Sequence, residues 1–189
     1  MITGKYPSLR LRRNRKFSWT RRLIRENDLS SNDLILPIFL TDGKNKKIEI
    51  KSMPGIFKYS IDMLPKIVDK TISNKIPLIA FFPNTLIRKK NNIGTEALNE
   101  NNLVCKALRL TKKRYKNEIG LMADVALDPY TTHGHDGLIK KNKILNDATI
   151  EILIKQSILQ AEMGSDVLAP SDMMDGRIGA IRRALNKKK

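Results

Sequence analysis

The chain has 189 residues, 41% of them hydrophobic and 29% charged, which is ordinary for a globular protein with a substantial core. We expect no membrane partner, because no apolar run approaches the roughly 18 residues of a membrane span. We expect no secretory signal, because the basic residues 6–19 contain no apolar h-region. The single cysteine excludes an internal disulfide framework and indicates a reducing, cytoplasmic location. The net charge of +17 is compatible with a nucleic-acid partner. The basic residues are scattered, however, without interleaved aromatic side chains. We therefore favour a general bias of the composition toward Lys, Asn and Ile as the origin of the charge.

The first part of the chain, residues 1–32, lacks the apolar patterns of the later segments. Its Arg-rich stretch Arg10–Arg25 is too polar to form a core. A segment of this kind is better suited to contacting a neighbouring subunit than to packing inside its own chain.

Four apolar, β-branched segments predict strands at residues 34–39, 77–82, 119–127 and 166–170. They are apolar on both faces, which is typical of buried parallel strands. Their starts lie about 45 residues apart, which leaves room for a helix and its loops in each interval.

Residues at helical spacing predict a helix after each of these strands. We expect Ser60 and Asp147 to cap the first and third helices, Gly164 to end the third, and Asp172 or Asp175 to cap the fourth. Four strand–helix units in this order predict right-handed crossovers and a parallel sheet. Four such units make half of an eight-stranded barrel.

Polar runs follow the third and fourth strands, from Asp124 to Asp136 and from Ala169 to Arg177. In a parallel α/β protein the carboxyl ends of the strands form the edge where ligands bind. Both runs resemble the porphobilinogen synthase family, also called delta-aminolevulinic acid dehydratase. The resemblance covers nearly the whole chain and extends through the segments Arg10–Arg13, Asp33–Phe39 and Ser52–Gly55.

This resemblance implies the α/β fold class, specifically the amino-terminal half of a (β/α)8 TIM barrel with an extended N-terminal arm. Residues 1–32 would be the arm, and residues 33–189 would be the partial barrel of four βα units. Family members assemble as homo-oligomers, in the form of octamers, through this arm.

The reaction that the resemblance implies is the condensation of two 5-aminolevulinate molecules to porphobilinogen with loss of water. The family's Schiff-base lysines come from strands after the fourth, and this chain has no matching positions, so we expect it to be inactive alone. The alternative is an interaction subunit completed by a separate second half, because a half-barrel exposes sheet edges that invite pairing. A basic nucleic-acid-binding protein is the least favoured interpretation.

Four residues match substrate-pocket positions of the family: Phe82, Asp124, Ser171 and Asp172. The resemblance implies that the aromatic ring packs on substrate and that the polar side chains line the pocket. Capping of strand ends or packing in the core is the alternative interpretation for each of the four, and it applies most readily to the phenylalanine.

The loop after the third strand carries three cysteines in zinc-using members of the family, and the matching residues here are Ala126, Asp128 and Asp136. A Cys-type zinc site is therefore absent, and the two carboxylates suit Mg²⁺ or no metal. Turn formation by Asp-Pro and Asp-Gly pairs is the alternative. For His133 and His135 we favour a role in ordering the loop, because no third nitrogen or sulfur ligand lies nearby in the sequence.

Overall fold

The computed structural model describes residues 4–188, and the chain divides into two compact units, Met1–Ser30 and Ser31–Lys189. The first unit contains a short 3-10 helix, η1 (Arg13–Arg15), and the helix α1 (Ser18–Leu23). None of its described residues is buried, and even Trp19 is 58% exposed. The described part of this unit therefore has no hydrophobic core of its own.

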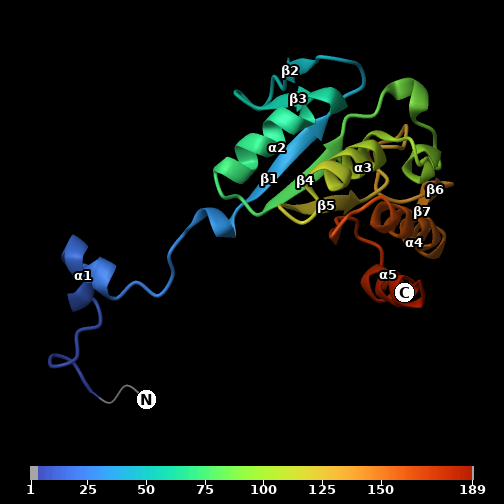
Figure 1. Ribbon diagram of the computed structural model, residues 1–189. Helices are drawn as coiled ribbons and strands as arrows, with labels where there is room; N and C mark the ends of the chain where they lie inside the picture. The colour runs from blue at the N-terminus through green and yellow to red at the C-terminus, as the bar shows by residue number, and fades with distance from the viewer. Residues whose placement is uncertain (1–3, 189) are drawn as a thin grey trace. The chain divides into compact units, whose positions relative to one another are not determined.

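The second unit is built on a six-stranded sheet in the order β2-β3-β1-β4-β5-β8 (Figure 1). Four of its strands pair in parallel in the order β1 (Ile35–Leu40), β4 (Leu78–Pro83), β5 (Gly120–Val125) and β8 (Val167–Pro170). These are the strands expected from the apolar runs, and their parallel pairing is confirmed. The α/β class with a mostly parallel sheet follows.

Two short pairs of strands were not expected from the sequence. The strand β2 (Lys47–Glu49) pairs antiparallel with β3 (Phe57–Tyr59), which in turn lies parallel to the carboxyl end of β1. The strands β6 (Ile139–Lys140) and β7 (Lys143–Ile144) form a separate ribbon. Their two or three residues are too few to produce an alternating pattern in the sequence.

A helix follows each parallel strand, as expected: α2 (Leu64–Ser73), α3 (Leu103–Tyr115), α4 (Asn146–Glu162) and α5 (Arg177–Lys187). Short 3-10 turns, η2 (Ser31–Asp33) and η3 (Ile61–Met63), precede β1 and α2. The end of α4 is as expected, because Gly164 follows it with a φ of +105°, in the left-handed region that favours glycine.

The expected capping residues were mostly wrong. Ser60 makes no cap, because its Oγ accepts the Lys46 N–H at 2.8 Å. Asp147 lies inside the first turn of α4, which begins one residue earlier. Gly176, with a φ of +83°, precedes α5 in place of an aspartate cap.

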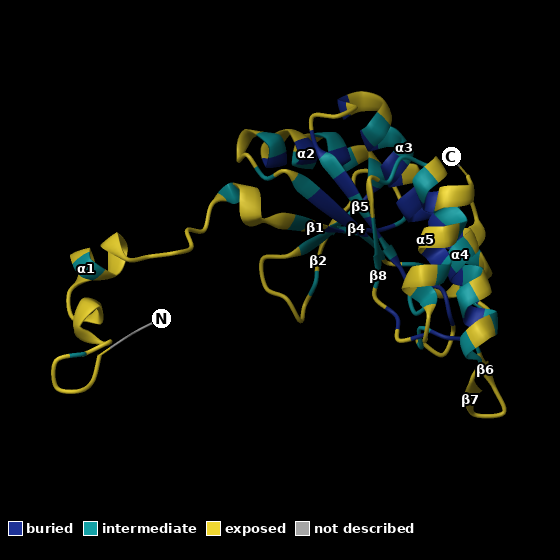
Figure 2. Ribbon diagram, turned by 90° about the horizontal axis from the view of Figure 1, so that it is seen from below, coloured by how far each residue is buried: buried dark blue, intermediate teal, exposed yellow. Residues whose placement is uncertain are grey.

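The hydrophobic core lies between the sheet and these helices (Figure 2). Strand residues such as Ile79 and Leu121 pack against Val68 of α2 and Leu108 of α3. Within residues 31–188, no helix covers the opposite face of the sheet (Figures 1 and 2). Of the described residues, 4–188, none lies in a helix with the length and apolar character that crossing a membrane requires.

One edge of the sheet is open. The strand β8 is the last in the order, and an apolar groove of about 670 Å³ runs beside it, lined by residues of α4 and α5 that include Ile158 and Ile181. A smaller groove of about 240 Å³ lies between β1 and α2, beside Leu36 and Ile67. An apolar groove beside an edge strand, such as the one beside β8, is a surface on which further chain can pack.

Candidate functional site

The carboxyl end of β5 places a carboxylate on the open face of the sheet. Ala123 and Val125 are buried against the helices, so Asp124, between them, points the other way. The register sets Asp124 opposite Ala169 of β8, and the Ser171 hydroxyl beyond that strand donates to Asp124 Oδ1 at 2.7 Å. Asp124 and Ser171 therefore lie in one layer, as two neighbouring parallel strands require.

Burial and like charges raise the pKa of Asp124 above its ordinary value. Desolvation is the largest cause, the hydrogen bond from Ser171 opposes it, and the charges of Asp136 and Asp172 add to the rise. Each neighbour comes from a loop at the same edge of the sheet. The carboxyl groups thus form one electrostatic cluster, in which an additional cation or proton is favoured.

Asp128, in the turn after β5, belongs to the same cluster. Its pKa is also raised, first by burial, then by the charges of Asp136 and Asp124, while Lys90 acts in the opposite direction. Asp128 and Asp136, which the resemblance matches to metal positions of the family, therefore lie close enough to interact electrostatically. Among residues 4–188, however, no group of three or more His, Cys, Asp or Glu side chains is placed to hold a metal ion. The carboxylates do not make a metal cage by themselves.

The side chain of Asp172 makes its polar contacts within the turn that follows β8. Its side chain is fully buried, and its Oδ1 accepts the Met174 N–H at 2.7 Å. Its Oδ2 lies 3.0 Å from Arg177 Nε, but this N–H is not aligned for a hydrogen bond, so the contact is an ion pair. Arg177 Nη1 donates to the Met174 carbonyl at 3.0 Å. These contacts fix the turn between β8 and α5, directly after Ser171.

Phe82 of β4 lies on the open face. Its neighbour Phe81 is buried among the helices, and the ring of Phe82 lies 5.7 Å from the ring of Phe39 on β1. The pair provides a half-buried aromatic surface on the same side of the sheet as Asp124. Core packing against the helices, the alternative for Phe82, does not describe this position.

The two histidines order the loop between β5 and β6. The His135 N–H donates to His133 Nδ1 at 3.1 Å, and the Gly137 N–H donates to His135 Nδ1 at 2.9 Å. Each Nδ1 therefore accepts, which assigns the ring hydrogen to Nε2 in both neutral rings. These contacts agree with the expected loop-ordering role.

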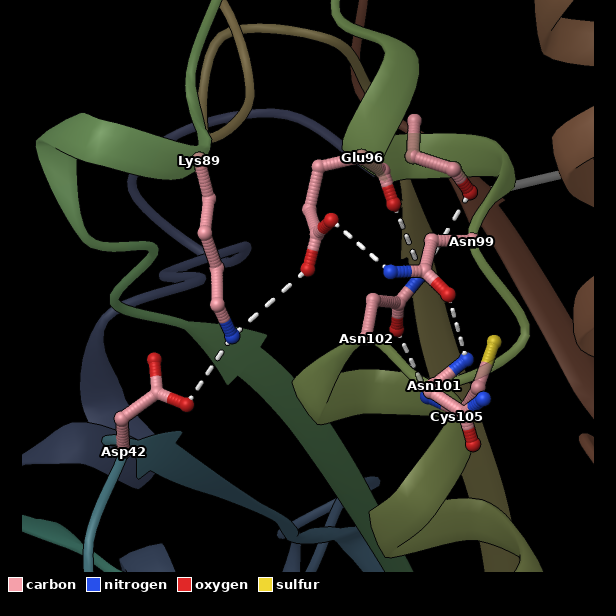
Figure 3. A network of polar contacts seen from close by, with 8 residues as sticks. Asp42, Lys89, Glu96, Asn99, Asn101, Asn102 and Cys105 are labelled. Atoms are coloured by element: carbon pink, nitrogen blue, oxygen red, sulfur yellow. Dashed lines mark hydrogen bonds and ion pairs between the residues drawn. The ribbon is translucent and has the colours of Figure 1, made fainter.

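Sequence reasoning missed a network in the loop between β4 and α3, which contains η4 (Ile87–Lys89) and η5 (Thr95–Leu98). Lys89 Nζ lies 3.0 Å from Asp42 Oδ1, just after β1, and 3.8 Å from Glu96 Oε1 (Figure 3). At the far end of the loop, Asn102 caps α3 by accepting the Cys105 N–H at 2.8 Å. No sequence signal links a lysine to an aspartate 47 residues away.

The same loop is joined to the one that carries the carboxylates. The Asn91 N–H donates to the Tyr130 carbonyl at 3.2 Å, and the Thr132 N–H donates to the Asn91 carbonyl at 3.2 Å. The loops after β1, β4 and β5 are thus connected across the carboxyl edge of the sheet. This connection holds Asp128 and Asp136 in place from the side opposite to β8.

Comparisons with known proteins agree on one family. The family model described as delta-aminolevulinic acid dehydratase matches residues 8–189. Proteins of that name from Bradyrhizobium diazoefficiens and Chlamydia pneumoniae are 51% and 42% identical, each over 95% of this chain and over 51% and 54% of their own lengths. A crystal structure of the Toxoplasma gondii enzyme in complex with porphobilinogen matches with a TM-score of 0.89 at 39% identity, covering 95% of this chain and 51% of that one. The chain spans about half the length of these relatives.

Proposed function

We propose, since the chain belongs to the delta-aminolevulinic acid dehydratase family, that it forms the amino-terminal half of a porphobilinogen synthase active site. One observation carries the proposal. Asp124 and Ser171, from the ends of two neighbouring parallel strands, are hydrogen bonded at 2.7 Å inside a cluster of carboxylates. Parallel α/β folds bind their ligands at this edge.

In this proposal the second unit is half of a (β/α)8 barrel. Its helices lie on one face of the sheet, the other face is uncovered by helices within residues 31–188, and the strand β8 ends the sheet without a further neighbour. Residues 1–32 act as an arm that contacts another subunit of a homo-oligomer, which would cover exposed apolar side chains such as Leu23. The single, buried thiol of Cys105 suits the reducing cytoplasm.

The substrate class follows from the charges and surfaces of the site. 5-Aminolevulinate carries an ammonium group, which suits the carboxylates of Asp124 and Asp128, and a short carbon chain, which suits the ring of Phe82. Ser171 would hold Asp124 in orientation, and Asp172 would shape the turn beneath it. Asp128 and Asp136, each binding through one oxygen, would supply two of the about six oxygen ligands that Mg²⁺ takes.

The condensation also needs an amine nucleophile in a dry pocket, and none of the lysines among residues 4–188 is buried. A lysine forms a Schiff base when its neutral amine attacks the substrate ketone and water leaves, so it must lose its proton first. Of the lysines near the carboxylates, Lys89 is ion paired with Asp42, and Lys90 is partly exposed. We therefore assign substrate binding to this chain and the Schiff-base step to a further polypeptide segment.

The test is trapping with borohydride. Residues 1–189 are incubated with 5-aminolevulinate and borohydride, and the intact mass is measured. We expect no stable adduct, because a reduced Schiff base requires a neutral lysine in contact with the ketone. Lys89→Met and Lys90→Met serve as matched variants. An adduct that disappears in either variant would assign the nucleophile to this chain and contradict the division of roles.

The interaction-subunit alternative is favoured by a separate observation. The groove of about 670 Å³ beside β8 is lined mainly by apolar residues such as Leu168 and Leu185, next to a strand with one unpaired edge. A polypeptide that presents a strand and a helix fits such a surface. In that case the chain is a subunit that contributes half of a catalytic site.

A further inference from the structure

The buried face of α4 is unusually polar. Gln156 and Ser157 are completely buried and Gln160 is 2% exposed, at positions where a helix packed on a sheet normally presents aliphatic side chains. Gln156 and Gln160 are the only two glutamines in the chain, and both belong to the helix that follows the strand bearing Asp124. Neither is accounted for by the substrate contacts proposed above.

Each glutamine donates to one backbone carbonyl at the site. Gln160 Nε2 lies 2.8 Å from the Asp124 carbonyl oxygen, and Gln156 Nε2 lies 3.1 Å from that of Ala126. The first carbonyl belongs to the residue that carries the central carboxylate. The second lies midway between Asp124 and Asp128. The two amides therefore hold the end of β5 and the start of its loop.

The strand needs such donors because its own ladder ends there. The pairing of β4 with β5 stops at Phe81 opposite Ala123, and β4 itself ends at Pro83, which has no amide hydrogen. A buried carbonyl that has no hydrogen-bond donor is destabilised by its desolvation, so a donor from outside the sheet is favoured. Gln160, one helical turn beyond Gln156, provides it for Asp124.

Packing alone does not explain the choice of glutamine. The Oε1 atoms of Gln156 and Gln160 are buried without a hydrogen-bond partner among the described residues, as is Ser157 Oγ. An apolar side chain at either place would avoid that desolvation. What a glutamine adds at each position is an amide N–H that donates to a backbone carbonyl at the end of β5 or in its loop.

We propose that Gln156 and Gln160 are positioning residues, which hold the backbone at Ala126 and Asp124 so that the carboxylates of Asp128 and Asp124 keep their places in the cluster. The assignment of these carboxylates to substrate rests on the proposed function, but their positioning does not. Gln160 acts on Asp124, and Gln156 acts on the turn that leads to Asp128.

The experiment compares Gln160→Met and Gln156→Met with the matched control Ser157→Ala, all in residues 1–189. Methionine keeps the length and removes the donor, whereas the control removes a buried hydroxyl that has no partner. NMR titration follows the carboxyl carbons of Asp124 and Asp128, and hydrogen exchange follows the amide of Ser171, whose N–H bonds the Val125 carbonyl.

We expect Gln160→Met to lower the pKa of Asp124 toward its ordinary value, because a loosened strand end admits water, and to speed exchange at Ser171 by about tenfold. Gln156→Met should change the pKa of Asp128 more than that of Asp124. Ser157→Ala should change neither pKa. If Gln160→Met fails to fold, the comparison of Gln156→Met with Ser157→Ala tests the proposal by itself.

Titrations in the methionine variants that match those of Ser157→Ala would overturn the proposal. So would equal shifts of both carboxyls in both variants, which would indicate general loosening. Since no substrate is used, the outcome is independent of whether the chain binds 5-aminolevulinate.

Discussion

Replacing Arg177 by methionine tests the turn that follows β8. The change keeps the aliphatic stem and removes the cation 3.0 Å from Asp172 Oδ2, whose side chain is fully buried. Asp172 would keep only the Met174 N–H as a donor. An uncompensated buried charge remains, so we expect the free energy of unfolding to fall.

The magnitude follows from the geometry of the pair. Removing one partner of a buried ion pair costs about 3–5 kcal/mol. The Arg177 side chain is 25% exposed, and its Nε is not aligned for a hydrogen bond to the carboxylate, so the lower end of this range applies. We therefore expect a loss of about 3 kcal/mol, most of it from the stranded carboxylate.

Urea unfolding followed by circular dichroism measures the loss, with the double variant Asp172→Asn, Arg177→Met as the control. The double variant removes the charge along with its partner, so it should be clearly more stable than Arg177→Met. A single variant that loses less than about 1 kcal/mol, or a double variant that is no more stable, would refute the view that Asp172 is a buried, paired charge.

Three further predictions concern the carboxyl edge of the sheet. Ser171→Ala should raise the pKa of Asp124 further, because it removes a hydrogen bond that favours the charged form; an unchanged or lowered pKa in an NMR titration would contradict this. Asp136→Asn should lower the pKa values of Asp124 and Asp128 and stabilise the fold at neutral pH. That gain should vanish as the pH falls through the raised pKa values, since protonation removes the same repulsion. Lys89→Met should speed hydrogen exchange in residues 84–102, and it should cost about 1 kcal/mol because the pair is partly exposed.

The parallel sheet could be predicted because its strands carry continuous apolar runs at regular spacing. The segment Leu78–Pro83, for example, is apolar on both faces and is followed by a helical pattern. Helix starts were less predictable, since several residues compete to satisfy the same N–H groups. Ser60 bonds Lys46, a partner in the β2–β3 region that no local pattern reveals.

The placement of the site residues could be predicted in part. Asp124 and Ser171 were expected at one edge because they follow neighbouring parallel strands, and the 2.7 Å hydrogen bond between them agrees with this. Contacts between distant loops were not predictable. The pairing of Lys89 with Asp42, and the donation of Gln160 to the Asp124 carbonyl, depend on the folded arrangement and leave no local pattern.

The central claim is tested most directly by porphobilinogen formation in a two-component mixture. Residues 1–189 are combined with the segment of the Bradyrhizobium diazoefficiens relative that lies beyond its match to this chain, and 5-aminolevulinate is added. We expect no product from either component alone, turnover from the mixture, and loss of that turnover in Asp124→Asn. Porphobilinogen made by residues 1–189 alone, or a mixture whose turnover does not change in Asp124→Asn, would contradict the account.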